Sequence, residues 1–343
     1  MEDRPTATRE LLALLRGHRL TDIVTTAVRL GIPDAIATGS TDSESIAAVT
    51  GTHPPTLYRL LRALASAGVL REEPFGRFGL TALGQLLRSG TPGSVVPWAE
   101  LIGRPYMRAA WGDLEHSVRT GENAFAAHFG EDIWTWRGAR PEESATFDRA
   151  MTSQSFGVGE GVAAAFDFGK ANIVADIGGG SGALLASILR AHPHLRGVLF
   201  DQAAVVERAT ELVAAGVMDR CEVVAGSFFD AVPAGADVYV MKAILHDWED
   251  AESIAILRKV ASVIPPTGSL LLVERVVGPP NEDLEGKLSD LHMLVMPGGR
   301  ERTREEWADL LRQGGFELRD VRPARGPWQV VLSTPVVTER SGA

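Results

Sequence analysis

One histidine and one glutamate of the second half of the sequence lie at or just after the ends of apolar, strand-like runs, and a second glutamate lies in a loop. His246 comes shortly after VYVMK, Glu274 ends the run SLLLVE, and Glu301 lies in the stretch GGRERT. A carboxylate bonded to one ring nitrogen of an imidazole fixes its tautomer and leaves the other nitrogen free to take a proton. We therefore expect His246 to act as a general base, with Glu274 facing it and Glu301 as a possible second partner.

Each of these residues also has a purely structural interpretation. A histidine just after a strand often does no more than start a helix or pack against a neighbour. The glutamates could be solvated loop charges, or could pair with Arg275 or Arg302. For Glu301 alone, a solvated loop charge or such a salt bridge is the default expectation.

The stretch NIVADIGGGSGALLASIL, residues 172–189, predicts a strand, a tight glycine turn and a helix. Glycines let the backbone approach a ligand, and the start of the helix offers unpaired N–H groups, so the turn suits a nucleotide-like molecule. The spacing Gly178-x-Gly180-x-x-Ala183 also fits a nicotinamide dinucleotide. However, Asp176 would repel a pyrophosphate and attract an ammonium, which favours S-adenosylmethionine. Asp201 can accept ribose hydroxyls in either kind of enzyme.

Strands and helices alternate from residue 171 onward, which predicts a parallel sheet covered by helices on both faces. The last two runs, FELRDVRP and WQVVLSTPV, leave no room for a helix between them and predict an antiparallel hairpin at the sheet edge, which counts against a dehydrogenase. Ligands of such sheets bind beyond the carboxyl ends of the strands. The side chains expected at that rim are Asp176, Asp201, Ser227, Phe228, Met241, Lys242, His246, Asp247, Trp248 and Glu274.

The first half of the chain predicts a helical domain. Residues 7–30 have the apolar spacing of one amphipathic helix, and a helix–turn–helix followed by a small hairpin extends to residue 81. This winged-helix outline has two interpretations: Arg59 and Arg62 could read DNA, or the unit could pack against a twin subunit. Residues 91–170 are expected to be mostly helical, and either form core or roof a pocket for a flat apolar substrate.

Composition favours a soluble protein of one or two domains. The 343 residues carry a net charge of −10, which disfavours a general affinity for nucleic acid. No run approaches the ~20 apolar residues of a membrane span. The first residues, MEDRPTATRE, lack the apolar core of a signal sequence, so we expect a cytoplasmic location. The single cysteine, Cys221, excludes disulfides within the chain.

Four stretches together resemble a known family: VADIGGGSG, MKAILHDWED, LLLVERV and PGGRERTREEWADLLRQGGFE. They are similar to the S-adenosylmethionine-dependent small-molecule O-methyltransferases of the plant caffeate and hydroxyindole type and of bacterial antibiotic pathways. The resemblance implies an α/β fold: a Rossmann-like class I methyltransferase sheet with an antiparallel C-terminal hairpin, plus a mainly α-helical winged-helix dimerisation domain. The implied division is dimerisation domain 1–95, helical linker 96–155 and catalytic domain 156–343.

The resemblance also implies a homodimer that methylates a phenolic hydroxyl of an aromatic secondary metabolite, releases S-adenosyl-L-homocysteine and needs no metal. It makes His246 the base, with Glu274, Glu301 and Asp247 around it. The residues that it places at the cofactor are Ser155, Asp176, Gly178, Gly180, Asp201, Gln202, Ser227, Phe228, Lys242 and Trp248. Those that it places at the acceptor are Met151, His292 and Met293.

Two of these positions depart from the family pattern, since Ser227 stands where many members have Asp and Gln202 where Leu is usual. Two other functions stay open. One is a winged-helix regulator that senses a small molecule, and the other is an enzyme that keeps the cofactor for hydroxylation or decarboxylation. The mass of the product would distinguish the last from methylation.

Overall fold

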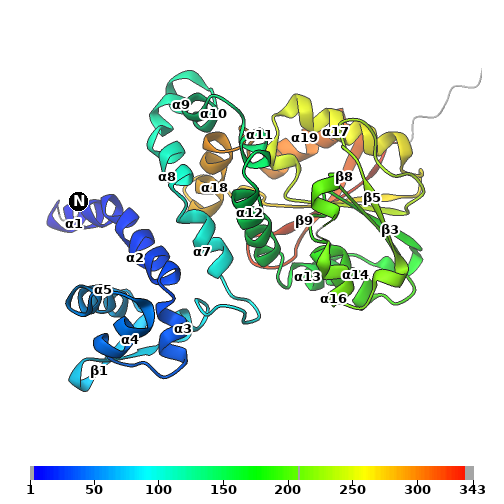
Figure 1. Ribbon diagram of the computed structural model, residues 1–343. Helices are drawn as coiled ribbons and strands as arrows, with labels where there is room; N and C mark the ends of the chain where they lie inside the picture. The colour runs from blue at the N-terminus through cyan, green and yellow to red at the C-terminus, as the bar shows by residue number, and fades with distance from the viewer. Residues whose placement is uncertain (1–3, 208, 337–343) are drawn as a thin grey trace, which may run out of the picture. The chain divides into compact units, whose positions relative to one another are not determined.

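The computed structural model of the protein describes residues 4–207 and 209–336. The chain forms two compact units (Figure 1). The first contains the chain up to Arg108 together with Glu142–Gln154, and the second contains Ala109–Pro141 and the chain from Ser155 onward. Within the described residues, no helix is long and apolar enough to cross a lipid bilayer.

The first unit is helical and carries one small hairpin. A capping box between Asp42 and Ser45 starts the helix that follows it, and the next helix begins at Pro54, a residue suited to a first helical turn. The helix–turn–helix and hairpin are therefore confirmed. The elements are α1 (Arg4–Leu15), α2 (Gly17–Arg29), α3 (Ile32–Ala37), α4 (Ser43–Thr50), α5 (Pro54–Ser66), β1 (Leu70–Glu73), β2 (Arg77–Leu80), α6 (Ala82–Gln85), α7 (Val96–Ile102), part of α8 (Pro105–Gly112) and most of α12 (Pro141–Gln154).

The prediction of a single helix over residues 7–30 is wrong, because this segment forms two separate helices, α1 and α2. The backbone N–H of Arg16 bonds to the carbonyl of Ala13, and that of Arg19 bonds to the carbonyl of Arg16. These bonds span three residues instead of four and mark a tight turn at Arg16, beside Gly17, a poor helix former. The apolar spacing continues across the break, so the pattern alone did not reveal it.

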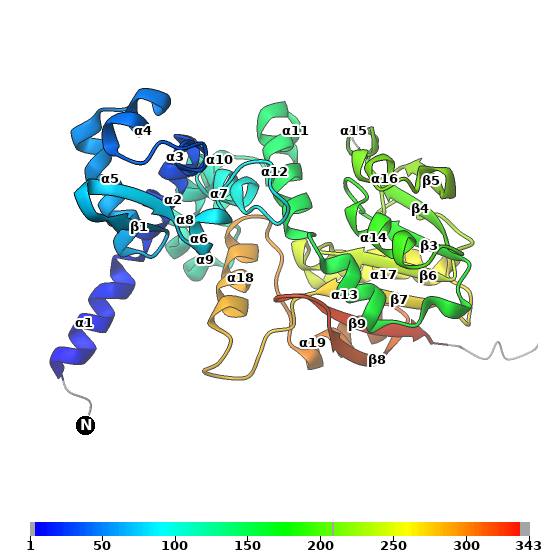
Figure 2. The ribbon, with the colours of Figure 1, turned by 90° about the horizontal axis from the view of Figure 1, so that it is seen from below.

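The second unit contains a sheet of seven strands in the order β5-β4-β3-β6-β7-β9-β8. The first five strands are parallel, and β9 runs antiparallel to both β7 and β8. Figure 2 shows β5 and β8 at opposite ends of the sheet. The parallel sheet and its antiparallel edge hairpin are thus confirmed. The strands are β3 (Ile173–Ile177), β4 (Arg196–Asp201), β5 (Cys221–Ala225), β6 (Val238–Lys242), β7 (Ser269–Glu274), β8 (Phe316–Pro323) and β9 (Gln329–Pro335).

Helices cover both faces of this sheet, with α13, α14 and α16 on one side and α17 and α19 on the other (Figure 1). Two apolar cores result, one around Leu185 and Val240 and one around Leu257 and Trp307. The helices of the unit are α9 (Leu114–Thr120), α10 (Ala124–Phe129), α11 (Ile133–Gly138), α13 (Val158–Ala165), α14 (Ala183–Ala191), α15 (Ala203–Val206), α16 (Thr210–Ala214), α17 (Asp250–Val263), α18 (Leu284–Val295) and α19 (Arg304–Gln313).

Candidate active site

The neighbouring strands β6 and β7 bring His246 and Glu274 together. The two strands run parallel, so their carboxyl ends meet at one edge of the sheet. Lys242 and Val273 form the last residue pair between them. The chain then turns through a 3₁₀ segment, Leu245–Asp247, that carries the histidine. Glu274 Oε1 accepts hydrogen bonds from the backbone N–H groups of Ile244 (3.1 Å) and Leu245 (3.0 Å). The glutamate thus holds the turn as well as facing the imidazole.

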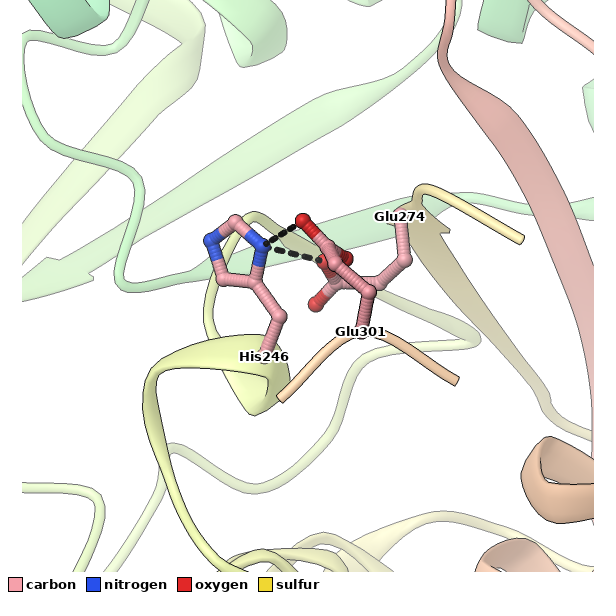
Figure 3. Close-up of side chains that lie close together, drawn as sticks. All are labelled: His246, Glu274 and Glu301. Atoms are coloured by element: carbon pink, nitrogen blue, oxygen red, sulfur yellow. Dashed lines mark hydrogen bonds and ion pairs between the residues drawn. The ribbon is translucent and has the colours of Figure 1, made fainter. Parts of the chain in front are cut away.

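Two carboxylates face the same nitrogen of the His246 ring. Nδ1 lies 3.1 Å from Glu301 Oε1, at hydrogen-bond distance, and 3.7 Å from Glu274 Oε2. Figure 3 shows Nε2 on the side of the ring away from both glutamates. Asp247 Oδ1 is 3.6 Å from Nε2, which is too long for a hydrogen bond. The ring is therefore held through Nδ1, and Nε2 makes no hydrogen bond with the described residues.

Glu301 is a buried partner of His246, so its interpretation as a solvated loop charge is wrong. Its residue is only 2% exposed. The hydroxyl of Ser289 donates to Oε1 at 2.7 Å, and the backbone N–H of Glu301 donates to Asp290 Oδ1 at 2.9 Å. Both partners belong to α18, which no local pattern placed beside the loop. Glu274 is likewise buried and does not pair with Arg275, which bonds to Glu285 instead.

The electrostatics of the cluster favour a protonated imidazole. Burial by itself lowers the pKa of His246, but the charges of Glu274, Glu301 and Asp247 outweigh it and raise that pKa well above its ordinary value. Burial raises the pKa of the Glu274 carboxyl and of the Asp247 carboxyl. Burial acts in the same direction on Glu301, but the charge of His246 and the hydrogen bonds from His246 and Ser289 outweigh it and keep the pKa of Glu301 below normal. The cluster therefore stabilises a positive charge on the ring.

The expected glycine turn follows β3. Gly178, Gly180 and Gly182 all have positive φ, of 72°, 58° and 83°, where other residues are strained. A Cβ on Gly178 would lie 2.4 Å from Ile244 Cδ1, whereas a Cβ on Gly180 would meet no atom within 4 Å. The turn therefore approaches the loop after β6 on one side and is open on another. Asp201, at the end of β4, accepts from the N–H of Gly180 at 2.9 Å.

Asp176 lies beneath this turn, where a Cβ on Gly179 would be 2.7 Å from its carboxyl carbon. Neither carboxylate oxygen has a well-formed hydrogen bond among the described residues. Burial and the charge of Asp201 raise the pKa of Asp176 to about 7. Lys242 is its counter-charge, and burial lowers the lysine pKa to about 8. A buried carboxyl group without a well-formed hydrogen bond, beneath an open glycine turn, fits the binding of a cationic nucleoside such as S-adenosylmethionine, whose positive charge would favour the ionised carboxylate.

Several aromatic side chains cluster near the carboxyl ends of the strands. The Trp248 ring lies 6.2 Å from Phe228 and 4.8 Å from Phe229, both in edge-to-face arrangements. Ser227 Oγ accepts from the backbone N–H of Phe229 at 3.3 Å, so it shapes the turn that carries the two phenylalanines. Trp134 of α11 is nearly parallel to Trp248, with ring centroids 6.3 Å apart. Flat apolar surfaces of this kind suit the adenine expected there.

The remaining predicted positions are placed as follows. Gln202 precedes α15, and its N–H donates to its neighbour Asp201 at 2.7 Å. His292 and Met293 lie on α18, with Met293 buried. Ser155 begins the part of the second unit that follows α12, whereas Met151 belongs to the first unit.

Sequence reasoning missed several side chains around the site. Trp111 donates its indole N–H to His292 Nδ1 at 3.0 Å. Trp328 lies under three groups: the Lys242 ammonium 4.2 Å from its ring centre, the Arg275 guanidinium at 5.6 Å, and the His246 ring at 6.5 Å between centres. These tryptophans are far in sequence from their partners, and the only available signal was the residue type.

Among the described residues, His246, Glu274 and Glu301 also present ligand atoms within 4.8 Å of one another, close enough to hold a metal ion. An ion there would compete for Nδ1, which already bonds to Glu301. The geometry as it stands is that of a hydrogen-bonded imidazole.

Comparison with known proteins agrees with this fold. A model of the O-methyltransferase domain matches residues 111–317, and a model of the O-methyltransferase dimerisation domain matches residues 12–90. The phenazine O-methyltransferase PhzM of Lysobacter antibioticus is 42% identical over 95% of this chain and 96% of its own. The O-demethylpuromycin-O-methyltransferase of Streptomyces alboniger is 40% identical over 96% of this chain and 90% of its own. The crystal structure of LaPhzM superposes with a TM-score of 0.91, covering 96% of this chain and 99% of that one.

The chain therefore belongs to the S-adenosylmethionine-dependent O-methyltransferases. It is an enzyme of the type found in antibiotic and other secondary-metabolite pathways. The fold class and the cofactor expected from the sequence are confirmed, and the regulator interpretation gives way to an enzyme.

Proposed function

We propose that the protein methylates a phenolic hydroxyl of an aromatic metabolite, with His246 as the general base. The observation that carries this proposal is the geometry of the ring: Nδ1 is held by Glu301 at 3.1 Å, and Nε2 is left for the acceptor. When bound, S-adenosylmethionine supplies an electrophilic methyl group. We assign Gly178, Gly180 and Asp201 to the donor's nucleoside, and the buried charge of Asp176 to its cationic end.

The raised pKa of His246 suits this acid–base step. A phenol has a pKa of about 10, so proton transfer to an ordinary imidazole of pKa about 6.5 is uphill. Glu274, Glu301 and Asp247 raise the pKa of His246 toward that of the phenol, which makes the free-energy cost of the proton transfer smaller. Whether the acceptor arrives as a phenol at a neutral ring or as a phenolate at a charged one, the same phenolate–imidazolium pair results.

The state of His292 indicates what else the acceptor carries. The indole of Trp111 can only donate, so Nδ1 of His292 accepts and the proton of the neutral ring is on Nε2. Burial, with the positive charges of Arg137 and His246, lowers the pKa of His292 to about 4, so the ring stays neutral at working pH. No acceptor for the Nε2 proton lies among the described residues. We infer that it donates to a carbonyl, carboxylate or ring nitrogen near the reacting hydroxyl.

The names of relatives support an acceptor of this chemistry. One relative is a 3-amino-4-hydroxybenzoate 4-O-methyltransferase, and a solved structure, 35% identical, is an O-methyltransferase in complex with S-adenosylmethionine and 2-hydroxy-5-methyl naphthoic acid. Both 3-amino-4-hydroxybenzoate and 2-hydroxy-5-methyl naphthoic acid are hydroxylated aromatic acids. The match to the dimerisation domain supports a homodimer. We keep the division into residues 1–95, 96–155 and 156–343, with Met151 and Met293 at the acceptor, as part of the proposal.

His246→Ala tests the base. The variant is expected to keep its affinity for S-adenosylmethionine, measured by calorimetry, and to lose about 10²- to 10⁴-fold in methylation rate. An unchanged rate with a hydroxylated aromatic acid would remove His246 from the mechanism. His192→Ala, at a histidine after α14, is the matched control.

A second activity has to be considered, because one relative, 36% identical, is an aclacinomycin 10-hydroxylase. Product mass distinguishes the two reactions, since methyl transfer adds a methyl group in place of a hydrogen, whereas hydroxylation adds one oxygen. The expected product is heavier than the acceptor by one methyl group less one hydrogen.

A further inference from the structure

Arg302, next to Glu301, is the most extensively bonded side chain of the site region. The arginine is 1% exposed and packs its guanidinium over the ring of Trp307, with 5.2 Å between the guanidinium carbon and the ring centre. A buried guanidinium is costly unless its donors are satisfied. Its partners therefore show which part of the molecule the residue holds in place.

Those partners belong to the turn that carries the base. Nη1 of Arg302 donates to the carbonyl of Leu245 at 3.1 Å, and Nη2 donates to the carbonyl of Trp248 at 3.1 Å. These carbonyls flank His246 and Asp247 on both sides. The planar guanidinium thus spans the catalytic turn from one end to the other, which a single ammonium could not do.

The same guanidinium fixes the helix that follows the turn. Nε and Nη2 both donate to Asp250 Oδ1, at 3.0 and 2.8 Å. Asp250 is the first residue of α17. Both nitrogens share one carboxylate oxygen through charge-assisted hydrogen bonds, so the end of the turn that carries His246 is tied to the start of α17.

The backbone of Arg302 contacts the segment that follows β7. Its carbonyl accepts from the N–H of Val277 at 3.0 Å, and it forms a parallel bridge with Val276. Val276 lies two residues beyond Glu274. One residue therefore contacts the turn of His246 and the extension of β7, and is covalently joined to Glu301.

The loop before Arg302 is pressed against the same turn. The backbone N–H of Arg300 donates to the carbonyl of His246 at 2.9 Å. A Cβ on Gly299 would lie 2.1 Å from that carbonyl oxygen, so only glycine fits there. These contacts set the distance between the loop that contains Gly299 and the turn that carries His246. The hydrogen bonds of the Arg302 side chain then hold the two segments at that distance.

We propose that Arg302 is a positioning residue for the base, which holds the turn of His246 at hydrogen-bond distance from Glu301 by bridging the carbonyls of Leu245 and Trp248 to Asp250. This role rests on the proposed function of His246, because it acts through that ring. Arg302 itself touches neither the imidazole nor, in this assignment, the substrates.

Arg302→Lys tests the proposal, since lysine keeps the charge but cannot bridge three acceptors in one plane. We expect kcat to fall by about 10- to 100-fold, with the Kd for S-adenosylmethionine unchanged. The rising limb of the pH–rate profile should move to lower pH, because His246 drifts from its carboxylates. Arg312→Lys is the matched control, as that side chain lies on the exposed face of α19 and pairs with Asp309.

A merely structural role would lower the unfolding temperature but leave the pH limb and the kcat per folded molecule unchanged, and that result would overturn the proposal. If Arg302→Lys does not fold, Asp250→Asn weakens the same bridge from a half-exposed position and should shift the limb in the same direction. An unshifted limb would again overturn it. Failure of the proposed function is distinguishable, because His246→Ala would then retain the wild-type rate.

Discussion

Replacing Glu301 by glutamine tests how the carboxylates of the site control His246, the proposed base. The change keeps the size and one acceptor oxygen of the side chain but removes the charge 3.1 Å from His246 Nδ1. At that distance and an effective dielectric constant of about 20, Coulomb's law gives roughly 5 kcal/mol for two full charges. The loss should be smaller, because Glu274 still faces the ring at 3.7 Å.

We take the effect as that of one hydrogen bond to a charged group, about 1.5–3 kcal/mol. Since 1.36 kcal/mol is a factor of ten, the methylation rate should fall by about 10- to 150-fold. Removing the carboxylate lowers the pKa of His246, so the rising limb of the pH–rate profile moves to lower pH. The assay is the initial rate of methyl transfer from labelled donor between pH 5 and 10, with donor affinity measured separately.

Glu305→Gln is the matched control, because Glu305 is an exposed residue near the start of α19. It should leave both the rate and the pH limb unchanged. The reasoning is refuted if Glu301→Gln retains the wild-type rate, or if its rate falls while the limb stays in place, since Glu301 would then not act through the charge of the ring.

The remaining predictions concern the cofactor side. The pKa of Asp176 is raised to about 7, so the folded protein holds that proton more tightly than the unfolded chain, and stability falls as pH rises from about 4 to about 7. Asp176→Asn should therefore gain stability relative to wild type across this window, by up to about 4 kcal/mol in denaturant unfolding, and a pH-independent difference would contradict the assignment. Gly178→Ala should weaken donor binding in calorimetry, because its Cβ would lie 2.4 Å from Ile244 at a φ of 72°. Gly216→Ala, at a similar φ of 67° but in open space, should lower only the stability, and equal donor affinity in the two variants would speak against the turn as the binding site.

Much of the fold followed from local patterns. The glycine turn, the alternating strands and the final hairpin each leave a signal within about twenty residues, because period and turn chemistry are local properties. The break between α1 and α2 was not predictable in this way, since the apolar spacing continues through Arg16.

The site likewise contains residues that the sequence predicted and residues that it did not. The sequence by itself determined which residue types stand at the carboxyl ends of the strands, so His246 and Glu274 were found from the order of β6 and β7. Only the tertiary structure decided that Glu301 is buried against the imidazole, that Ser289 and Asp290 of α18 hold it there, and that Arg302 bonds across the turn that carries His246. These partners are separated by up to 57 positions along the chain. Burial and a hydrogen-bond partner are properties of the packed molecule, and an arginine or glutamate in a loop has the same local sequence whether it faces water or the base.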